Sequence, residues 1–326
     1  MQQTINIQEL ENALNKYGDI VLTKNSKNDV IIMSISEYKR KLKDNELSKK
    51  LEKAEQQIKD GKTVKATTVF RELEEKYGLT EALIAVPAYE QSSDQEVAFQ
   101  AVDYILRVLK KNMVFGMTWG RAMHEFVEQL AKDERLRSLS FQNVKVVPFL
   151  GTPGAIQSDS WNTTTYSNTL ATKVGNLLHC ASYNLSAPMY VEGTKEKELI
   201  ESIDEIAKVL HMAETADIAL IGIGSMQDDS SIIKAEIRTK EEYKELVRKG
   251  AVGEIVGRIY DKNGQTVDEY LKRKMVGISL DKIAKIPVRV GMSYGKDKIE
   301  AIKGAIAGGL VNVLVTDVPT AELLLK

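Results

Sequence analysis

Apolar runs long enough for β-strands alternate with amphipathic helical runs through most of this 326-residue chain. We expect strands at 82–86, 113–117, 144–149, 218–223, 288–292 and 311–316, and helices at 94–110, 199–214 and 297–307. Parallel strands need long crossovers, usually helices, so this order predicts an α/β fold with a mostly parallel, doubly wound sheet. Such sheets bind ligands at the carboxyl ends of their strands. The turns that follow the strands are therefore the first candidates for a functional site.

The segment before this alternation predicts a separate small unit. Residues 1–42 combine a helix near 7–17 with two short strands, 20–22 and 30–33, joined by a hairpin loop at 24–29. A charge-rich helix over 37–62 and a shorter one over 69–77, ended by Gly78, follow. We therefore divide the chain into an α+β unit at 1–42, a helical linker at 43–78 and a large α/β domain at 79–326.

Charge and cysteine content narrow the class of protein. The net charge of −1 gives no global field that would indicate a nucleic-acid partner, although a basic patch on one small domain remains compatible with it. The single cysteine, Cys180, excludes an internal disulfide and a cysteine-rich zinc site and fits a cytoplasmic protein. No signal peptide, membrane span or membrane partner is expected. The scattered histidines, His124, His179 and His211, predict neither a metal site nor a cofactor.

Glycines gather where several predicted strands end. In 250–258 they surround one acid, Glu254; a strand, a turn and a second strand is the simpler interpretation, and contact with a ligand hydroxyl is the alternative. Residues 116–121 follow a strand and open a helix, where backbone N–H groups and Arg121 could hold a phosphate; a plain turn with a surface arginine is the alternative. Residues 222–225 make a poor dinucleotide fingerprint, because Gln227 replaces its third glycine.

Four segments in a fixed order carry a specific resemblance. Residues 115–123, 216–225, 250–258 and 308–317 resemble, in sequence and order, the effector-binding domain of the SorC family of bacterial transcriptional regulators. The resemblance covers about 73–326 and implies a sheet like that of sugar-phosphate isomerases, a phosphorylated sugar as effector, and a homodimer or homotetramer. Such regulators normally begin with a helix-turn-helix, and residues 1–80 show no pair of short helices of that kind.

The SorC resemblance also implies a set of effector-binding residues. Glu254 would accept hydrogen bonds from sugar hydroxyls, and Lys298 would neutralise a phosphate. Leu150 stands where regulators of bisphosphates tend to have an arginine, which favours a monophosphorylated or uncharged sugar. Arg121-Ala122 replaces the Thr or Ser of the family's hydroxyl-rich loops. The expected site comprises Thr118, Trp119, Gly120, Arg121, Gly151, Thr152, Gly224, Ser225, Glu254 and Lys298.

The first 77 residues resemble a different family, the Phd/YefM antitoxins. The similar stretches are 5–7, 21–25, 31–38 and the tail over 51–73. Antitoxins of this family are dimers that bind operator DNA with a small N-terminal unit and wrap a toxin with a charged helical tail. The resemblance implies DNA contact through Lys24 and Lys27, whereas the stretch 8–11, where the family commonly has an arginine, is acidic here. A small toxin protein is a possible further partner.

These observations favour a ligand-responsive regulator over an enzyme. The N-terminal unit would bind operator DNA, and the large domain would sense a phosphorylated sugar. The alternatives are a sugar-phosphate isomerase or deaminase, which shares the sheet architecture, and a toxin-neutralising antitoxin fused to a sugar sensor. No histidine stands beside acids in a loop where it could transfer protons, so we expect no catalytic residue.

Overall fold

The computed structural model describes residues 19–24, 28–33, 66–86, 93–153, 163–228 and 230–326. Contacts divide the chain into two compact units, Met1–Lys65 and Ala66–Lys326. In the first unit, β1 (Asp19–Lys24) pairs antiparallel with β2 (Asn28–Met33), from Asp19 opposite Met33 to Lys24 opposite Asn28. The predicted hairpin is confirmed, with strands that reach closer to the turn than expected. The predicted helices at 7–17 and 37–62, and Lys27, lie outside the described residues.

The second unit is built on one parallel sheet of order β3-β12-β11-β7-β4-β5-β6. Every neighbouring pair of its strands runs parallel, which confirms the predicted doubly wound α/β fold. The strands are short and mostly buried, as expected for a sheet covered on both faces. They are β3 (Glu81–Ala85), β4 (Val114–Met117), β5 (Lys145–Pro148), β6 (Ala181–Ser182), β7 (Ile218–Gly222), β11 (Val288–Met292) and β12 (Val313–Asp317).

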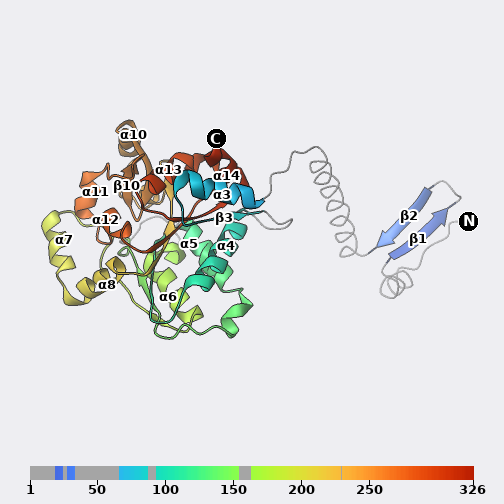
Figure 1. Ribbon diagram of the computed structural model, residues 1–326, viewed down its shortest axis with the longest axis horizontal. Helices are drawn as coiled ribbons and strands as arrows, with labels where there is room; N and C mark the ends of the chain where they lie inside the picture. The colour runs from blue at the N-terminus through green and yellow to red at the C-terminus, as the bar shows by residue number, and fades with distance from the viewer. Residues whose placement is uncertain (1–18, 25–27, 34–65, 87–92, 154–162, 229) are drawn as a thin grey trace, which may run out of the picture. The chain divides into compact units, whose positions relative to one another are not determined.

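Successive residues of the central strand β7 enter different cores. Ile218 and Leu220 pack with α4 (Ser93–Val108), α5 (Arg121–Leu130) and α6 (Ser167–Leu177) on one face. Ala219 and Ile221 belong to the core of the opposite face. That face is covered by α3 (Ala66–Tyr77), α8 (Asp204–Glu214), α13 (Ile299–Ala307), α14 (Val318–Leu325) and the short helices α9 (Ser231–Lys234), α10 (Lys240–Arg248), α11 (Glu269–Lys274) and α12 (Leu280–Ile283) (Figure 1).

A small antiparallel sheet of order β10-β9-β8 lies on the same side as α13. It consists of β8 (Gly224–Ser225), β9 (Ala251–Ile255) and β10 (Arg258–Asp261). Val256 and Gly257, both with positive φ (54° and 69°), form the turn between β9 and β10. The run 250–258 is thus a strand, a turn and a second strand, as the simpler interpretation had it. Glu254 lies in β9 directly opposite Gly224 of β8, and its contact with a ligand hydroxyl remains a prediction.

The prediction of one helix over 199–214 is wrong. The structure has α7 (Thr194–Glu201) and α8, separated at Ser202 and Ile203, and Ile203 has an extended backbone (φ −67°, ψ 124°). Leu199 and Ile203 are 69% and 49% exposed, so they form no apolar stripe with the rest of the segment. Ile206 and Val209 of α8 are instead buried in one cluster with Val276, a residue far along the chain that local helical spacing does not report.

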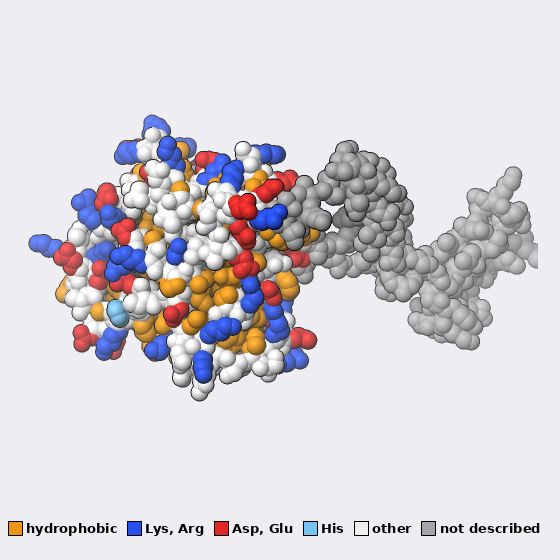
Figure 2. Space-filling view, viewed as in Figure 1, with side chains coloured by type: hydrophobic (Ala, Val, Ile, Leu, Met, Phe, Trp, Pro, Cys, Tyr) orange, Lys and Arg blue, Asp and Glu red, His pale blue; other side chains and the backbone are white. Residues whose placement is uncertain are grey.

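The surface carries charges of both signs. Figure 2 shows Lys and Arg side chains interspersed with Asp and Glu over the visible face of the second unit, around an apolar area. This mixture agrees with the balanced net charge of the sequence. In the part of the chain that the structure describes, no helix is long and apolar enough to cross a bilayer.

Candidate functional site

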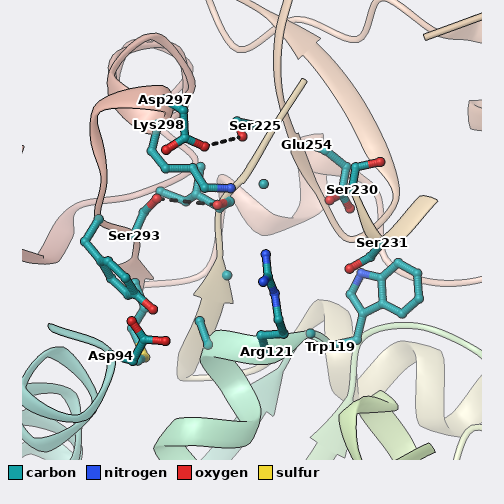
Figure 3. A pocket seen from close by; sticks show the side chains of 17 residues that line it. Asp94, Trp119, Arg121, Ser225, Ser230, Ser231, Glu254, Ser293, Asp297 and Lys298 are labelled. Carbon is teal, nitrogen blue, oxygen red and sulfur yellow. Dashed lines mark hydrogen bonds between the residues drawn. The ribbon is translucent and has the colours of Figure 1, made fainter. Parts of the chain in front are cut away.

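A cavity of about 320 Å³ opens at the carboxyl ends of β4, β7 and β11. β4 and β7 are neighbours in the sheet, but the chain leaves β4 toward β5 and leaves β7 toward β11. Loops that depart in opposite directions open a crevice, which is where ligands bind in doubly wound sheets. Figure 3 shows side chains from segments far apart in the sequence around this cavity. Its lining residues are Asp94, Trp119, Gly120, Arg121, Ala122, Gly222, Ile223, Gly224, Ser225, Ser230, Ser231, Glu254, Met292, Ser293, Tyr294, Asp297 and Lys298.

The loop after β4 brings the start of α5 to the cavity. Gly120 precedes this helix with φ of +109°, a conformation that favours glycine, and as the N-cap residue it has no side chain to cap the helix. The backbone N–H groups of the first turn therefore depend on other partners, and the helix dipole favours an anion there. Arg121 is the first residue of α5, and in Figure 3 its guanidinium extends into the cavity. This edge of the cavity has the elements of an anion site.

Thr118 has a supporting position instead of a lining one. It is fully buried, and its Oγ1 accepts a hydrogen bond from the Gly222 backbone N–H at 3.0 Å. This contact joins the ends of β4 and β7, which are the two strands that flank the crevice. Thr118 therefore fixes the shape of the site from below.

Glu254 is a buried carboxylate on the opposite wall. It is 6% exposed, and its Oε1 accepts a hydrogen bond from the Gly257 backbone N–H in the adjoining turn. Burial raises the pKa of Glu254, while the Gly257 hydrogen bond, the charge of Lys298 and a hydrogen bond from Trp119 act in the opposite direction. A Cβ atom at Gly224 would lie 2.6 Å from Glu254 Oε2, so a glycine at this position leaves room for the carboxylate.

The loop after β11 supplies the third wall. Gly295, with φ of +105°, precedes a 3₁₀ turn over Lys296–Lys298, which leads into α13. Asp297 Oδ2 accepts a hydrogen bond of 3.0 Å from Ser225 Oγ, so β8 and this turn are joined. Lys298 extends from the turn toward the cavity interior (Figure 3). Arg121 and Lys298 thus reach one cavity from different elements, with Glu254 opposite them.

The structure adds lining residues that the sequence analysis did not propose. Ser293 and Tyr294 follow β11, and the rule that sites form at the carboxyl ends of parallel strands would have indicated them. Asp94 lies in the first turn of α4, and no sequence signal connects it to the cavity. Ser230, another such lining residue, caps α9 by accepting a hydrogen bond from the Ile233 N–H.

The predicted residues divide into two groups. Thr118 lies beneath the cavity, and the predicted residues that line it are Trp119, Gly120, Arg121, Gly224, Ser225, Glu254 and Lys298. Gly151 and Thr152 are not among the lining residues. Gly151 packs against the carbonyl groups of Ala187 and Pro188, and Thr152 Oγ1 accepts a hydrogen bond from Asn168 Nδ2 at 2.7 Å. They follow β5, one strand beyond the crevice between β4 and β7.

Within the described residues, no group of three or more His, Cys, Asp and Glu side chains is arranged to hold a metal ion. His124 does have acidic neighbours that the sequence analysis overlooked. Its ring nitrogens lie 3.8 Å from carboxylate oxygens of Glu125 and Glu128, the latter one helical turn further along α5. This is a surface cluster of one histidine and two acids, and it lies outside the cavity lining.

Comparison with known proteins assigns the chain that forms this cavity to a family. The Sugar-bind family model, a sugar-binding domain, matches residues 62–326. The sorbitol operon regulator of Klebsiella pneumoniae is 30% identical over 260 residues, covering 78% of this chain and 79% of the regulator. The chain belongs to the family of SorC-type regulators with a sugar-binding domain. This SorC-type chain is also similar to the deoxyribonucleoside regulator of Bacillus subtilis (strain 168), at 25% identity over 78% of each chain.

Solved structures support the same assignment. The full-length sorbitol operon regulator SorC from Klebsiella pneumoniae has a TM-score of 0.71 and 27% identity, covering 81% of this chain and 82% of the regulator. A probable sor operon regulator from Shigella flexneri has a TM-score of 0.70 and 25% identity, covering 80% and 99%. These relatives are transcriptional regulators and not enzymes, which agrees with our expectation. The family match begins at residue 62, so the Phd/YefM-like character of the first segment remains a prediction.

Proposed function

We propose that the SorC-type domain binds a phosphorylated sugar in the cavity between β4 and β7, and that this binding controls operator binding by the N-terminal unit. One observation carries the proposal. Arg121 at the start of α5 and Lys298 from the turn before α13 reach the same cavity, and the buried Glu254 faces it from β9. Two cations suit a phosphate, and a carboxylate suits the hydroxyl groups of a sugar.

The phosphate would lie at the start of α5. The helix dipole and the first backbone N–H groups favour an anion at this point, and the Arg121 guanidinium can add two parallel hydrogen bonds. Lys298 would contribute a second charge from the other side of the cavity. Gly120 has no atom within 4 Å of an added Cβ, so a ligand can approach the backbone here closely.

The sugar ring would lie toward the wall formed by β8, β9 and the turn after β11. Glu254, Asp297, Ser225 and Ser293 place hydrogen-bond acceptors and donors on that wall. A volume of about 320 Å³ lies at the lower end of the range of small-ligand pockets. The cavity therefore suits a single monosaccharide phosphate.

The proposed control of operator binding is based on similarity to relatives that are named operon regulators. Lys24 and Lys27 of the N-terminal unit would contact operator DNA, and the chain would act as a homodimer or homotetramer. A sugar phosphate that changes operator affinity tenfold needs a coupling free energy of about 1.4 kcal/mol between the two sites. A modest change in subunit packing is enough to supply it.

A thermal-shift screen of the full chain tests the sugar site. Sugar phosphates are compared with the same sugars without phosphate, because only the phosphorylated forms can use Arg121 and Lys298. A ligand at 100 times its Kd stabilises the folded state by about 2.7 kcal/mol. Arg121→Gln should abolish the shift, whereas Arg137→Gln, on an exposed turn outside the cavity, should keep it. A screen in which no sugar phosphate raises the melting temperature would contradict the proposal.

The operator half needs a separate assay. The full chain is mixed with the promoter DNA upstream of its own gene in a gel-shift experiment, with and without the sugar phosphate found in the screen. We expect a retarded band whose intensity changes on addition of the sugar phosphate. The absence of a retarded band under every condition would contradict DNA binding but leave the sugar site standing.

A further inference from the structure

Asp94 brings a carboxylate to the cavity from an element unrelated to the strand ends. It lies in the first turn of α4, the helix that crosses from β3 to β4, and its side chain is exposed at the rim. Tyr294, from the loop after β11, also lines the cavity, and burial and then the neighbouring Asp94 carboxylate raise the pKa of its hydroxyl. Arg121 lies close enough to influence the same tyrosine electrostatically. In Figure 3, Asp94 and Arg121 lie on the same side of the cavity.

The charges that line the cavity limit what it can hold. Among the described lining residues the cations are Arg121 and Lys298, and the acids are Asp94, Glu254 and Asp297. A phosphate group carries close to two negative charges at neutral pH, so one phosphate matches the two cations. A second phosphate would meet no further cation of this lining, and near Arg121 it would meet the Asp94 carboxylate.

The same carboxylates favour hydroxyl donors. An ionised carboxylate has about four acceptor positions. The Asp94 side chain is exposed at the rim of the cavity. Asp297 accepts from Ser225 at 3.0 Å, and Glu254 accepts from the Gly257 N–H. Asp297 and Glu254 are therefore each held by a donor of the protein, and all three acids retain acceptor capacity. The hydroxyl groups of a polyhydroxylated ligand are suitable donors for it.

We propose that Asp94 is a specificity-determining residue that accepts a ligand hydroxyl and disfavours a second phosphate. This inference rests on the proposed sugar-phosphate site and makes it more specific. The ligand carries one phosphate, near Arg121 and Lys298, and a free hydroxyl on the side of Asp94. Discrimination arises from repulsion of the wrong ligand as well as from contact with the right one.

Isothermal titration of the full chain with matched ligands tests this assignment. The probes are fructose 6-phosphate with fructose 1,6-bisphosphate, and ribose 5-phosphate with ribose 1,5-bisphosphate. We expect the wild-type protein to prefer the monophosphate of at least one pair. Asp94→Asn keeps the shape of the side chain and removes its charge, so this preference should fall about tenfold. Tyr294→Phe changes a neighbouring lining residue but keeps the charge of Asp94, so the protein should still discriminate against the bisphosphate.

Asp103→Asn is the matched control. Asp103 lies on the same helix, and Asp103→Asn removes the same charge. Asp103 pairs with Arg135 on the surface (2.6 Å), however, and is not among the lining residues. It should leave the preference unchanged. An unchanged preference in Asp94→Asn, or an equal fall in Asp103→Asn, would overturn the role of Asp94 alone. A wild-type protein that prefers the bisphosphates would do the same. Failure of the wild-type protein to bind any sugar phosphate would overturn the proposed function together with this inference.

Discussion

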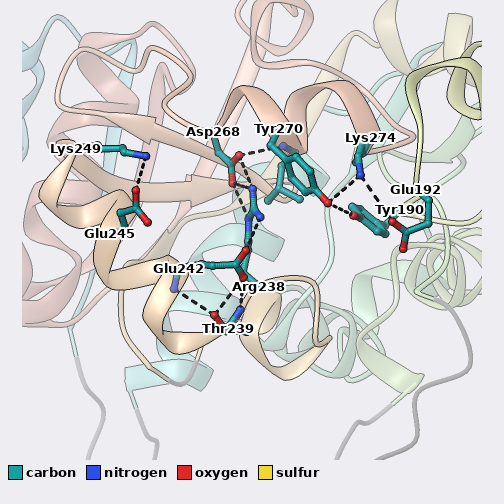
Figure 4. Close-up of polar contacts among 11 residues, drawn as sticks. Tyr190, Glu192, Arg238, Thr239, Glu242, Glu245, Lys249, Asp268, Tyr270 and Lys274 are labelled. Atoms are coloured by element: carbon teal, nitrogen blue, oxygen red, sulfur yellow. Dashed lines mark hydrogen bonds and ion pairs between the residues drawn. The ribbon is translucent and has the colours of Figure 1, made fainter.

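Replacing Asp268 by alanine should destabilise the second unit far more than breaking an exposed ion pair of the same length. Asp268 is 4% exposed and accepts hydrogen bonds from Arg238 Nε (3.0 Å) and Nη2 (2.7 and 2.8 Å). It also caps α11 by accepting a hydrogen bond from the Leu271 N–H at 3.0 Å. Figure 4 shows Asp268 bound to Arg238, whose guanidinium also contacts Glu242 and lies over the Tyr270 ring.

The size of the effect follows from what would remain around Arg238. Removing one partner of a buried ion pair costs about 3–5 kcal/mol, because the other charge stays buried without it. Arg238 would keep Glu242 at 3.0 Å and the face of the Tyr270 ring, 4.4 Å from its guanidinium carbon, so the lower end applies. Loss of the helix cap adds about 1 kcal/mol. We expect a total near 4 kcal/mol.

Glu245→Ala is the matched control. Glu245 pairs with Lys249 at 2.7 Å, the same separation as the closest Arg238–Asp268 contact. The side chains of Glu245 and Lys249 are, however, both more than half exposed. Water screens such a pair, so its loss should produce no measurable change. Urea unfolding followed by circular dichroism gives both free energies of unfolding. If Asp268→Ala cost no more than Glu245→Ala, our claim that burial and not distance sets the energy of these pairs would be refuted.

Two further predictions concern Glu254. Gly224→Ala would place a methyl group 2.6 Å from Glu254 Oε2. We expect it to lower the free energy of unfolding by about 1–3 kcal/mol and to abolish sugar-phosphate binding measured by titration. Retained binding would show that the carboxylate can move freely. Glu254→Gln should weaken ligand binding and change the pH dependence of stability. Because the pKa of Glu254 is raised, the native protein keeps a proton that the unfolded chain has lost, and wild-type stability falls as pH rises above the ordinary value of 4.5. The stability of Glu254→Gln relative to wild type should therefore increase from pH 4.5 upward. Urea unfolding at several pH values measures this difference in unfolding free energy. A difference that does not change with pH would contradict the prediction.

Local sequence patterns were sufficient for most strands and helices. The apolar run predicted as a strand at 288–292 coincides with β11, because a short continuous run of this kind between turns suits a strand buried on both faces. The helix predicted over 199–214 failed for the opposite reason. Its apolar spacing continues across Ser202, yet burial of α8 in a cluster with the distant residue Val276 outweighs the local pattern.

The candidate site was only partly accessible from sequence. Arg121, Glu254 and Lys298 were expected because glycine-rich turns and a family resemblance marked their segments, and the structure brings all three to one cavity. Gly151 had the same local signal, a glycine turn after a strand, but β5 lies outside the crevice. Asp94 had no signal, since a helix N-terminal acid is common and its position depends on where α4 crosses the sheet.

The sequence alone determined the class of fold, since alternating strands and helices leave a parallel sheet as the compact solution, and it determined the turns that could hold a ligand. Only the tertiary structure decided that β4 lies beside β7. That neighbourhood depends on contacts between residues about a hundred positions apart, such as the Gly222 N–H donating to Thr118 Oγ1. Local propensity acts over a few residues, whereas strand order is set by hydrogen bonding and burial between distant segments. The place of the crevice, and the meeting of Asp94 with Arg121 there, therefore come from the fold as a whole.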